Sequence, residues 1–124
     1  MPQRIEITAA SFETLVARNP GATVLEVGAP RCGPCRALLA VLDALVVEVG
    51  DAVRITSTNA DAEPDLAARL GVRSLPTLIV FRDGVEVERR VGFGGARPVR
   101  DLVTTLARDA APSAPCPALP VPRP

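Results

Sequence analysis

The order of apolar and polar residues along the chain predicts alternating strands and helices. A strand shows its side chains to two faces in turn, so apolar residues alternate with polar ones where one face is exposed and run on where both faces are covered. Glu26 is the one charged residue in a run of the second kind, and Asp83-Gly84 separates two β-rich runs as a hairpin turn does. The predicted strands are residues 4–7 (RIEI), 23–27 (TVLEV), 53–59 (VRITSTN) and the two arms of 77–91 (TLIVFRDGVEVERRV).

Apolar residues at helical spacing occupy the segments between these strands. Ser11 is predicted to cap the first helix, and Pro34 and Pro98 to lie in the first turns of the second and the last, where a missing amide proton costs nothing. The predicted helices cover residues 12–18, 34–49, 65–70 and 98–110. The resulting order βαβαβαββα predicts an α/β fold, a three-layer α/β/α sandwich with a central mixed sheet.

The length of the chain, 124 residues, suits one domain with a single core, which we expect to span residues 1–110. Six of the thirteen residues from Pro112 onward are proline, which fits neither helix interiors nor central strands. Residues 111–124 are therefore predicted to be a disordered Pro/Ala-rich tail. Cys116 in this tail is expected to be a free thiol without a specific role, with a partner-binding proline segment as the alternative.

Fourteen basic and fourteen acidic side chains cancel, which argues against a nucleic-acid or membrane-surface partner. No apolar run approaches the ~18 residues of a membrane span, and the first ten residues lack the apolar segment of a signal peptide, so a cytoplasmic location is expected. The absence of histidine excludes Cys-His and Ser-His-Asp nucleophiles and the commonest metal ligand. Proton transfer must then use carboxylates or thiols.

Cys32 and Cys35 enclose Gly33-Pro34 at the predicted start of a helix. The residues alone leave three interpretations open: a redox pair, half of a zinc site, or two buried thiols. Zinc is disfavoured, and no metal is expected, because a tetrahedral site takes four ligands and the third cysteine, Cys116, lies in the predicted tail.

If the two cysteines are a redox pair, the helix terminus assigns their roles. Unpaired amides and the helix dipole stabilise a thiolate there, so Cys32 is the expected nucleophile. Cys35, one turn further on, is the expected resolving thiol, which attacks the mixed disulfide and releases the reduced partner. No bound cofactor is then required beyond the Cys32–Cys35 disulfide.

The motif CGPCR after a strand, the stretch LGVRSLPTLIVFRDG about forty residues later, and VG after the hairpin resemble the thioredoxin family. The resemblance covers residues 4–110. It implies the thioredoxin fold and the reduction of protein disulfides, with electrons from NADPH through a thioredoxin reductase. A monomer is expected.

The resemblance also implies a substrate groove. Pro76 matches the family's cis-proline, which faces the dithiol, although the residues alone equally allow a trans proline at the start of a strand. A cis bond would expose the Leu75 backbone, which could pair with an extended substrate segment. The other residues expected to contact substrate are Arg31, Gly33, Pro34, Gly92 and Phe93. Phe93 could equally be a core residue.

Glu26 occupies the position at which the family carries a buried aspartate behind the second cysteine. Burial should raise its pKa, which suits it to accept the proton of Cys35 directly or through a water. The alternative is a solvated carboxylate on an edge strand. Ser57 stands where many family members have a lysine near that carboxylate, so one charge partner is missing from the motif.

Arg31 and Gly28 depart from the family, which has tryptophan at the first position and often an aromatic residue at the second. Arg31 is either a solvated cation or a charge that favours the Cys32 thiolate by about half a pKa unit. Ala40 replaces a helix-kinking proline, so a straighter helix is expected there.

Three functions are consistent with the sequence. The first is a thiol-disulfide oxidoreductase that reduces protein disulfides and is recharged by a reductase, and Gly-Pro between the cysteines favours it by resemblance. The alternative is a dedicated binding module that serves one partner without general reductase coupling, which the changes at positions 28 and 31 keep open. The third is an oxidant or isomerase whose potential is raised by Arg31.

Overall fold

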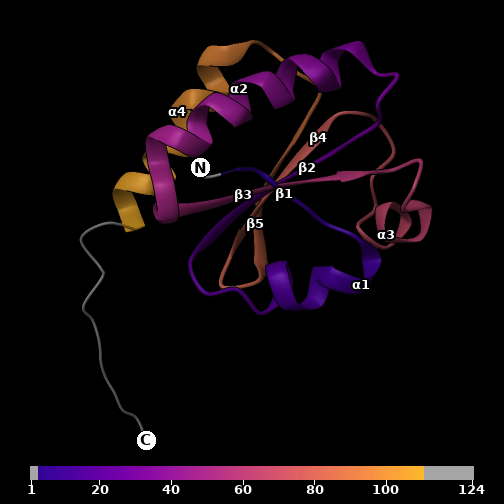
Figure 1. The fold of residues 1–124 in the computed structure, drawn as a ribbon, viewed down its shortest axis with the longest axis horizontal. Helices are drawn as coiled ribbons and strands as arrows, with labels where there is room; N and C mark the ends of the chain where they lie inside the picture. Colours follow the sequence, from indigo (N-terminus) through magenta and orange to yellow (C-terminus); the bar gives the residue numbers. More distant parts are fainter. Residues whose placement is uncertain (1–2, 111–124) are drawn as a thin grey trace, which may run out of the picture.

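A computed structural model describes residues 3–110 as a five-stranded sheet between two layers of helices (Figure 1). The strands are β1 (Ile5–Glu6), β2 (Ala22–Gly28), β3 (Val53–Asn59), β4 (Thr77–Arg82) and β5 (Val85–Val91). They lie in the order β1-β3-β2-β4-β5. The first three pair in parallel, whereas β4 is antiparallel to both of its neighbours, so the sheet is mixed as predicted.

The helices divide between the two faces of the sheet (Figure 1). One face is covered by α2 (Gly33–Val49) and α4 (Ala96–Ala110), and the other by α1 (Ala9–Phe12), the π-helical η1 (Glu13–Ala17) and α3 (Pro64–Arg69). A 3-10 turn, η2 (Gly50–Ala52), joins α2 to β3. This arrangement confirms the three-layer α/β/α sandwich. None of the helices in residues 3–110 has the length and apolar character needed to cross a membrane.

Each face of the sheet has its own apolar core because successive side chains of a strand point to opposite faces. On β2, Val24 packs with Leu42 of α2 and Val103 of α4. The next residue, Leu25, packs with Leu66 of α3 on the other face. By the same alternation, Glu26 points to the side of α2 and α4.

The first helix begins before the predicted cap. Thr8 is the N-cap: its Oγ1 accepts a hydrogen bond from the Ser11 amide at 3.2 Å, and Ser11 Oγ accepts one from the Thr8 amide at 3.0 Å. The two hydroxyls therefore form a capping box in which Ser11 is the third helical residue. The prediction of Ser11 as the cap was wrong because either hydroxyl residue could open the helix on sequence grounds.

The β4–β5 turn uses Asp83 and Gly84, as the hairpin pattern predicted, and both residues have positive φ, 53° and 82°. Asp83 is tied to Gly21 twice: its carboxylate accepts a hydrogen bond from the Gly21 amide at 2.7 Å, and its own amide donates to the Gly21 carbonyl at 2.9 Å. A Cβ on Gly84 would collide with the Ala17 carbonyl oxygen. The turn is therefore packed closely against the end of η1.

Candidate active site

The dithiol lies at the start of α2, shortly after the end of β2. Cys32 is the N-cap of α2, as predicted, and its sulfur accepts a hydrogen bond from the Cys35 amide at 3.2 Å. The two cysteines form a disulfide with their Cα atoms 5.2 Å apart. Cys35 is only 1% exposed, whereas Cys32 is half-buried, so a partner protein can reach Cys32 alone.

The disulfide favours a redox pair over half a zinc site or two separate buried thiols, because the two sulfurs are bonded to each other. Between residues 3 and 110 there is no group of three or more histidine, cysteine or acidic side chains that could hold a metal ion. The amide of Cys35, now directed at Cys32 Sγ, would stabilise a thiolate on that sulfur once the bond is reduced.

Glu26 lies under the dithiol in the middle of the sheet. It is 1% exposed and is flanked by Ser57 on β3 and Leu78 on β4, so it is not a solvated carboxylate on an edge strand. Its Oε2 has no hydrogen-bond partner within residues 3–110. Burial raises the pKa of Glu26 to about 7, against an opposing effect from the positive charge of Arg4.

Gly28 explains how a glutamate fits at this position. Position 28 faces the same side of the sheet as position 26, two residues earlier on β2. A Cβ on Gly28 would overlap Glu26 Oε2 and would lie only 2.9 Å from Cys35 Sγ. The carboxylate and the sulfur therefore border the same small volume, which places Glu26 directly beside the resolving thiol. An aromatic side chain at position 28 has no room on that side.

Arg4 is a component of this region that the sequence did not single out. Its Nη1 donates to Ser57 Oγ at 2.5 Å, and its Nε donates to Asp43 Oδ1 on α2 at 2.8 Å. The alternation of residues 4–7 was a usable signal, because it separates Arg4 and Glu6 from the two isoleucines. The pairing of β1 with β3, which brings Arg4 to Ser57, cannot be seen in the sequence.

The segment before β4 joins Pro76 to Gly92, two of the predicted groove residues. The Leu75–Pro76 peptide bond is cis, as the resemblance implied. The Pro76 carbonyl accepts a hydrogen bond from the Gly92 amide at 2.7 Å, which joins this segment to the end of β5. Within residues 3–110, neither the amide nor the carbonyl of Leu75 takes part in a hydrogen bond.

The remaining predicted groove residues differ in exposure. Gly33 and Pro34 are exposed at the start of α2. Phe93 is half-buried and packs against the apolar core beneath α2 and α4, so its core interpretation has direct support. Ala40 is exposed on α2, which runs without interruption from Gly33 to Val49.

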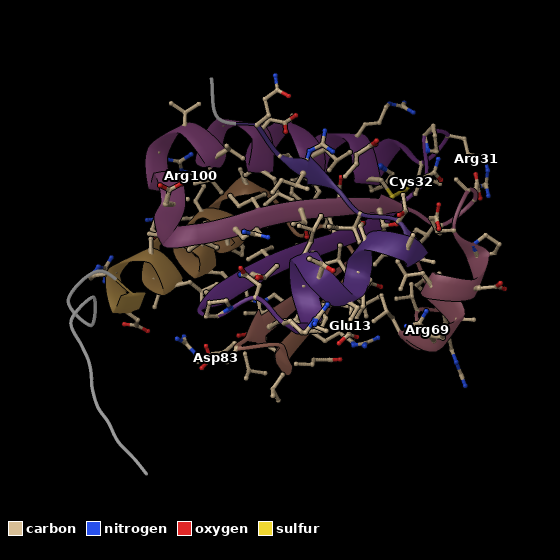
Figure 2. All side chains as sticks on the ribbon, turned by 60° about the horizontal axis from the view of Figure 1, so that its bottom comes forward. Glu13, Arg31, Cys32, Arg69, Asp83 and Arg100 are labelled. Carbon is tan, nitrogen blue, oxygen red and sulfur yellow. A yellow bond between two sulfur atoms is a disulfide. The ribbon has the colours of Figure 1, made fainter. Side chains whose placement is uncertain are left out.

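Arg31 lies at the same end of the molecule as Cys32 (Figure 2). It is exposed, and its Nη2 donates to Asp61 Oδ1 at 3.0 Å. Asp61 follows β3, and nothing in the sequence pattern marked it as a partner. The charge of Arg31 is therefore partly balanced by a carboxylate, which reduces its effect on the Cys32 sulfur below that of a lone cation.

The comparisons with known proteins agree with this geometry. The family profile described as Thioredoxin matches residues 3–108. The chain belongs to the thioredoxin family. It is 37% identical over 101 residues to the thioredoxin of Porphyra purpurea, which covers 82% of this chain and 92% of that protein. It is also 39% identical over 85 residues to the thioredoxin of Bacillus subtilis (68% and 82%) and 36% identical over 100 residues to thioredoxin 1 of Synechococcus elongatus (81% and 91%).

Membership in the thioredoxin family, together with the joined cysteine pair, makes this chain a thiol-disulfide oxidoreductase that acts as a protein-disulfide reductase. Its redox centre is the Cys32–Cys35 disulfide. Three of the positions at which the sequence was expected to depart from the family motif, Glu26, Gly28 and Arg31, lie near that centre.

Proposed function

We propose that this chain is a monomeric cytoplasmic electron carrier that reduces protein disulfides, with Cys32 as the nucleophile, Cys35 as the resolving thiol and Glu26 as the proton acceptor. The proposal rests on the difference in burial between the two cysteines. The half-buried Cys32 lies at a helix N-terminus, and the buried Cys35 lies beside a buried carboxylate.

In the first step, the Cys32 thiolate attacks one sulfur of a substrate disulfide. A bond forms between Cys32 Sγ and that sulfur, the substrate disulfide breaks, and the other substrate sulfur leaves as a thiolate. The position of Cys32 at the N-cap supports this role, because the unpaired amides of the first turn stabilise negative charge on its sulfur.

In the second step, Glu26 takes the proton of Cys35, directly or through a water. The Cys35 thiolate attacks Cys32 Sγ, the Cys32–Cys35 bond forms, and the second substrate sulfur leaves as a thiolate, so two electrons have passed to the substrate. The pKa of Glu26, raised to about 7 by burial, lets the carboxylate accept a proton near neutral pH and release it afterwards.

Substrate binding is proposed to use the Leu75 backbone. Its amide and carbonyl are unused within residues 3–110, so an extended segment of a partner could pair with them as an added strand. Arg31, Gly33, Pro34 and Gly92 would border that segment, and Phe93 would support the groove from the core. Main-chain pairing of this kind reads no particular sequence, which suits a carrier with many substrates.

Glu26→Gln tests the proton-acceptor role. We expect the resolution of a preformed mixed disulfide to slow about 100-fold, since general-base catalysis is worth that much or more, while the initial attack by Cys32 keeps its rate. Stopped-flow measurement of both steps checks this, with Glu48→Gln on the exposed side of α2 as the matched control. Equal slowing of the two steps would contradict the assignment.

Electrons are proposed to come from NADPH through a thioredoxin reductase, as the family resemblance implies. NADPH consumption with thioredoxin reductase and insulin distinguishes the carrier from the dedicated binding module. Continuous turnover supports the carrier. A cysteine pair that exchanges with a model disulfide but does not couple to the reductase would support the dedicated module instead.

A further inference from the structure

The start of the first strand brings an arginine to Ser57, the neighbour of the buried Glu26 in the sheet. In the sheet, Glu6 of β1 is opposite Ser57 of β3, and Ser57 is opposite Glu26 of β2. Arg4 lies two residues before Glu6 and therefore faces the same side of the sheet as all three. This side of the sheet is covered by α2, and the dithiol lies at the start of that helix.

The guanidinium of Arg4 is held from two directions. Nη1 donates to Ser57 Oγ at 2.5 Å, and Nε and Nη2 donate to the two carboxylate oxygens of Asp43 on α2, at 2.8 and 3.4 Å. The Arg4 side chain is 20% exposed, whereas Asp43 is 52% exposed. An ion pair with such an exposed partner adds little to folding stability, so its main effect is to fix where the positive charge lies.

We propose that Arg4 is a positioning residue of the resolving step: its charge, held by Ser57 and Asp43, stabilises the ionised form of Glu26 that accepts the Cys35 proton. The inference rests on the proton-acceptor role given above. Burial alone raises the pKa of Glu26, and Arg4 is the group whose charge opposes that rise. Position 57 on β3 is a serine, and the Arg4 guanidinium donates to its Oγ, directly across the sheet from Glu26 on β2.

Other polar and charged groups on this side of the sheet do not replace Arg4. The groups on this side lie on the elements around Glu26: Glu6 on β1, Ser57 on β3, Arg90 on β5, and Cys35 and Asp43 on α2, with the apolar Leu78 on β4. Glu6 is exposed. Arg90, two strands away, donates to Glu88 at 2.6 Å and to the Pro98 carbonyl at 3.2 Å.

The test compares Arg4→Met with Arg4→Lys across the pH range. Without the positive charge less Glu26 is ionised below its pKa, so resolution of the mixed disulfide by Arg4→Met should be about three- to tenfold slower near pH 6 and unchanged near pH 9. Arg4→Lys should recover most of the rate. Arg100→Met is the matched control, because Arg100 forms an exposed ion pair with Glu48 at the opposite end of the molecule from Cys32 and should leave the profile unchanged (Figure 2).

The titration of Glu26 in the oxidised protein, followed by carbon-13 NMR, separates this inference from the proposed function. An upward shift of both the NMR midpoint and the rate midpoint in Arg4→Met supports the inference. An unmoved NMR midpoint overturns it, even if Glu26→Gln slows resolution as expected. If the NMR midpoint moves but neither Arg4→Met nor Glu26→Gln changes the rate, Glu26 is not the proton acceptor, and the role of Arg4 in resolution falls with it.

Discussion

Glu26 and Gly28 act as one unit at the back of the dithiol. The glutamate is one methylene longer than an aspartate, and its Oε2 fills the space that a side chain at position 28 would need. A protein interior has little spare volume, so the two positions cannot be varied independently. The glutamate at position 26 and the glycine at position 28 therefore require each other in this packing.

Gly28→Ala tests this coupling. The added methyl group meets both Glu26 Oε2 and Cys35 Sγ, so we expect a loss of roughly 1–3 kcal/mol in the free energy of unfolding, the usual cost of overpacking. The double variant Gly28→Ala with Glu26→Asp should lose less unfolding free energy than the two single losses added together, because the shorter carboxylate lies further from the methyl group. Urea unfolding of the two single variants, the double variant and the parent measures the coupling, and a strictly additive double variant would count against it.

Features that depend on local spacing were predictable from the sequence. Cys32 was correctly placed at the N-cap of α2, and the cis bond before Pro76 was expected from the family resemblance, whereas the residues alone left a trans bond equally open. Arg4 and Asp61 did not emerge, because their partners lie on other strands and loops and only the sheet order brings them together. Glu26 falls between the two cases: its apolar neighbours predicted burial, but not the charge of Arg4 that acts on it.

At the scale of elements, the β4–β5 turn connects two parts of the chain that are distant in sequence. Asp83 exchanges hydrogen bonds with Gly21, just before β2, and Gly84 lies against the end of η1. These contacts hold the β4–β5 hairpin against the segment that precedes the central strand β2. This contact lies at one end of the β2–β4 pairing, and Pro76 lies directly before the other end of β4.

Gly84→Ala should be costly for two separable reasons. Its φ of 82° is unfavourable for a side chain, and the new Cβ would collide with the Ala17 carbonyl. We expect a loss of about 3 kcal/mol in the free energy of unfolding. Gly71→Ala is the matched control, since Gly71 has φ 70° but open space around it, and should lose about 1 kcal/mol. Equal losses in denaturant unfolding would mean that the contact with Ala17 is unimportant.

Element types were predictable because the apolar periodicity is strong, and each predicted strand and helix has a counterpart in the structure. The boundaries of the elements were predicted less accurately. The first strand shrank to Ile5–Glu6, and the first helix moved forward to the Thr8 cap. β1 is an edge strand, where fewer packing contacts limit the possible ends, and the first helix follows directly after it.

At the scale of the whole molecule, Glu26 links folding stability to pH. The pKa of Glu26 is about 7 in the folded chain against an ordinary value of 4.5, so between these values the folded chain binds a proton that the unfolded chain has released. The stability associated with this proton is fully present below about pH 4.5 and is lost as the pH rises through 7.

Relative to Glu26→Gln, the parent chain should therefore lose roughly 3 kcal/mol of unfolding free energy between about pH 4.5 and pH 8. The carboxyl of Glu86, whose pKa is lowered by its hydrogen bond from Arg89, titrates below this window and is common to both proteins. Urea unfolding at a series of pH values checks the difference. Parallel curves for the two proteins would show that Glu26 is ionised in the folded chain at neutral pH without cost.

The arrangement of Arg4, Ser57 and Glu26 affects how related sequences should be compared. An alignment reads one position at a time, so against a relative with a basic residue at position 57 it would register only the loss of that charge. Three-dimensional comparison gives another result, because a guanidinium from the neighbouring strand lies against that serine. A search for relatives with similar proton chemistry should therefore examine positions 4 and 57 together. A basic residue at either position would meet the requirement for a positive charge.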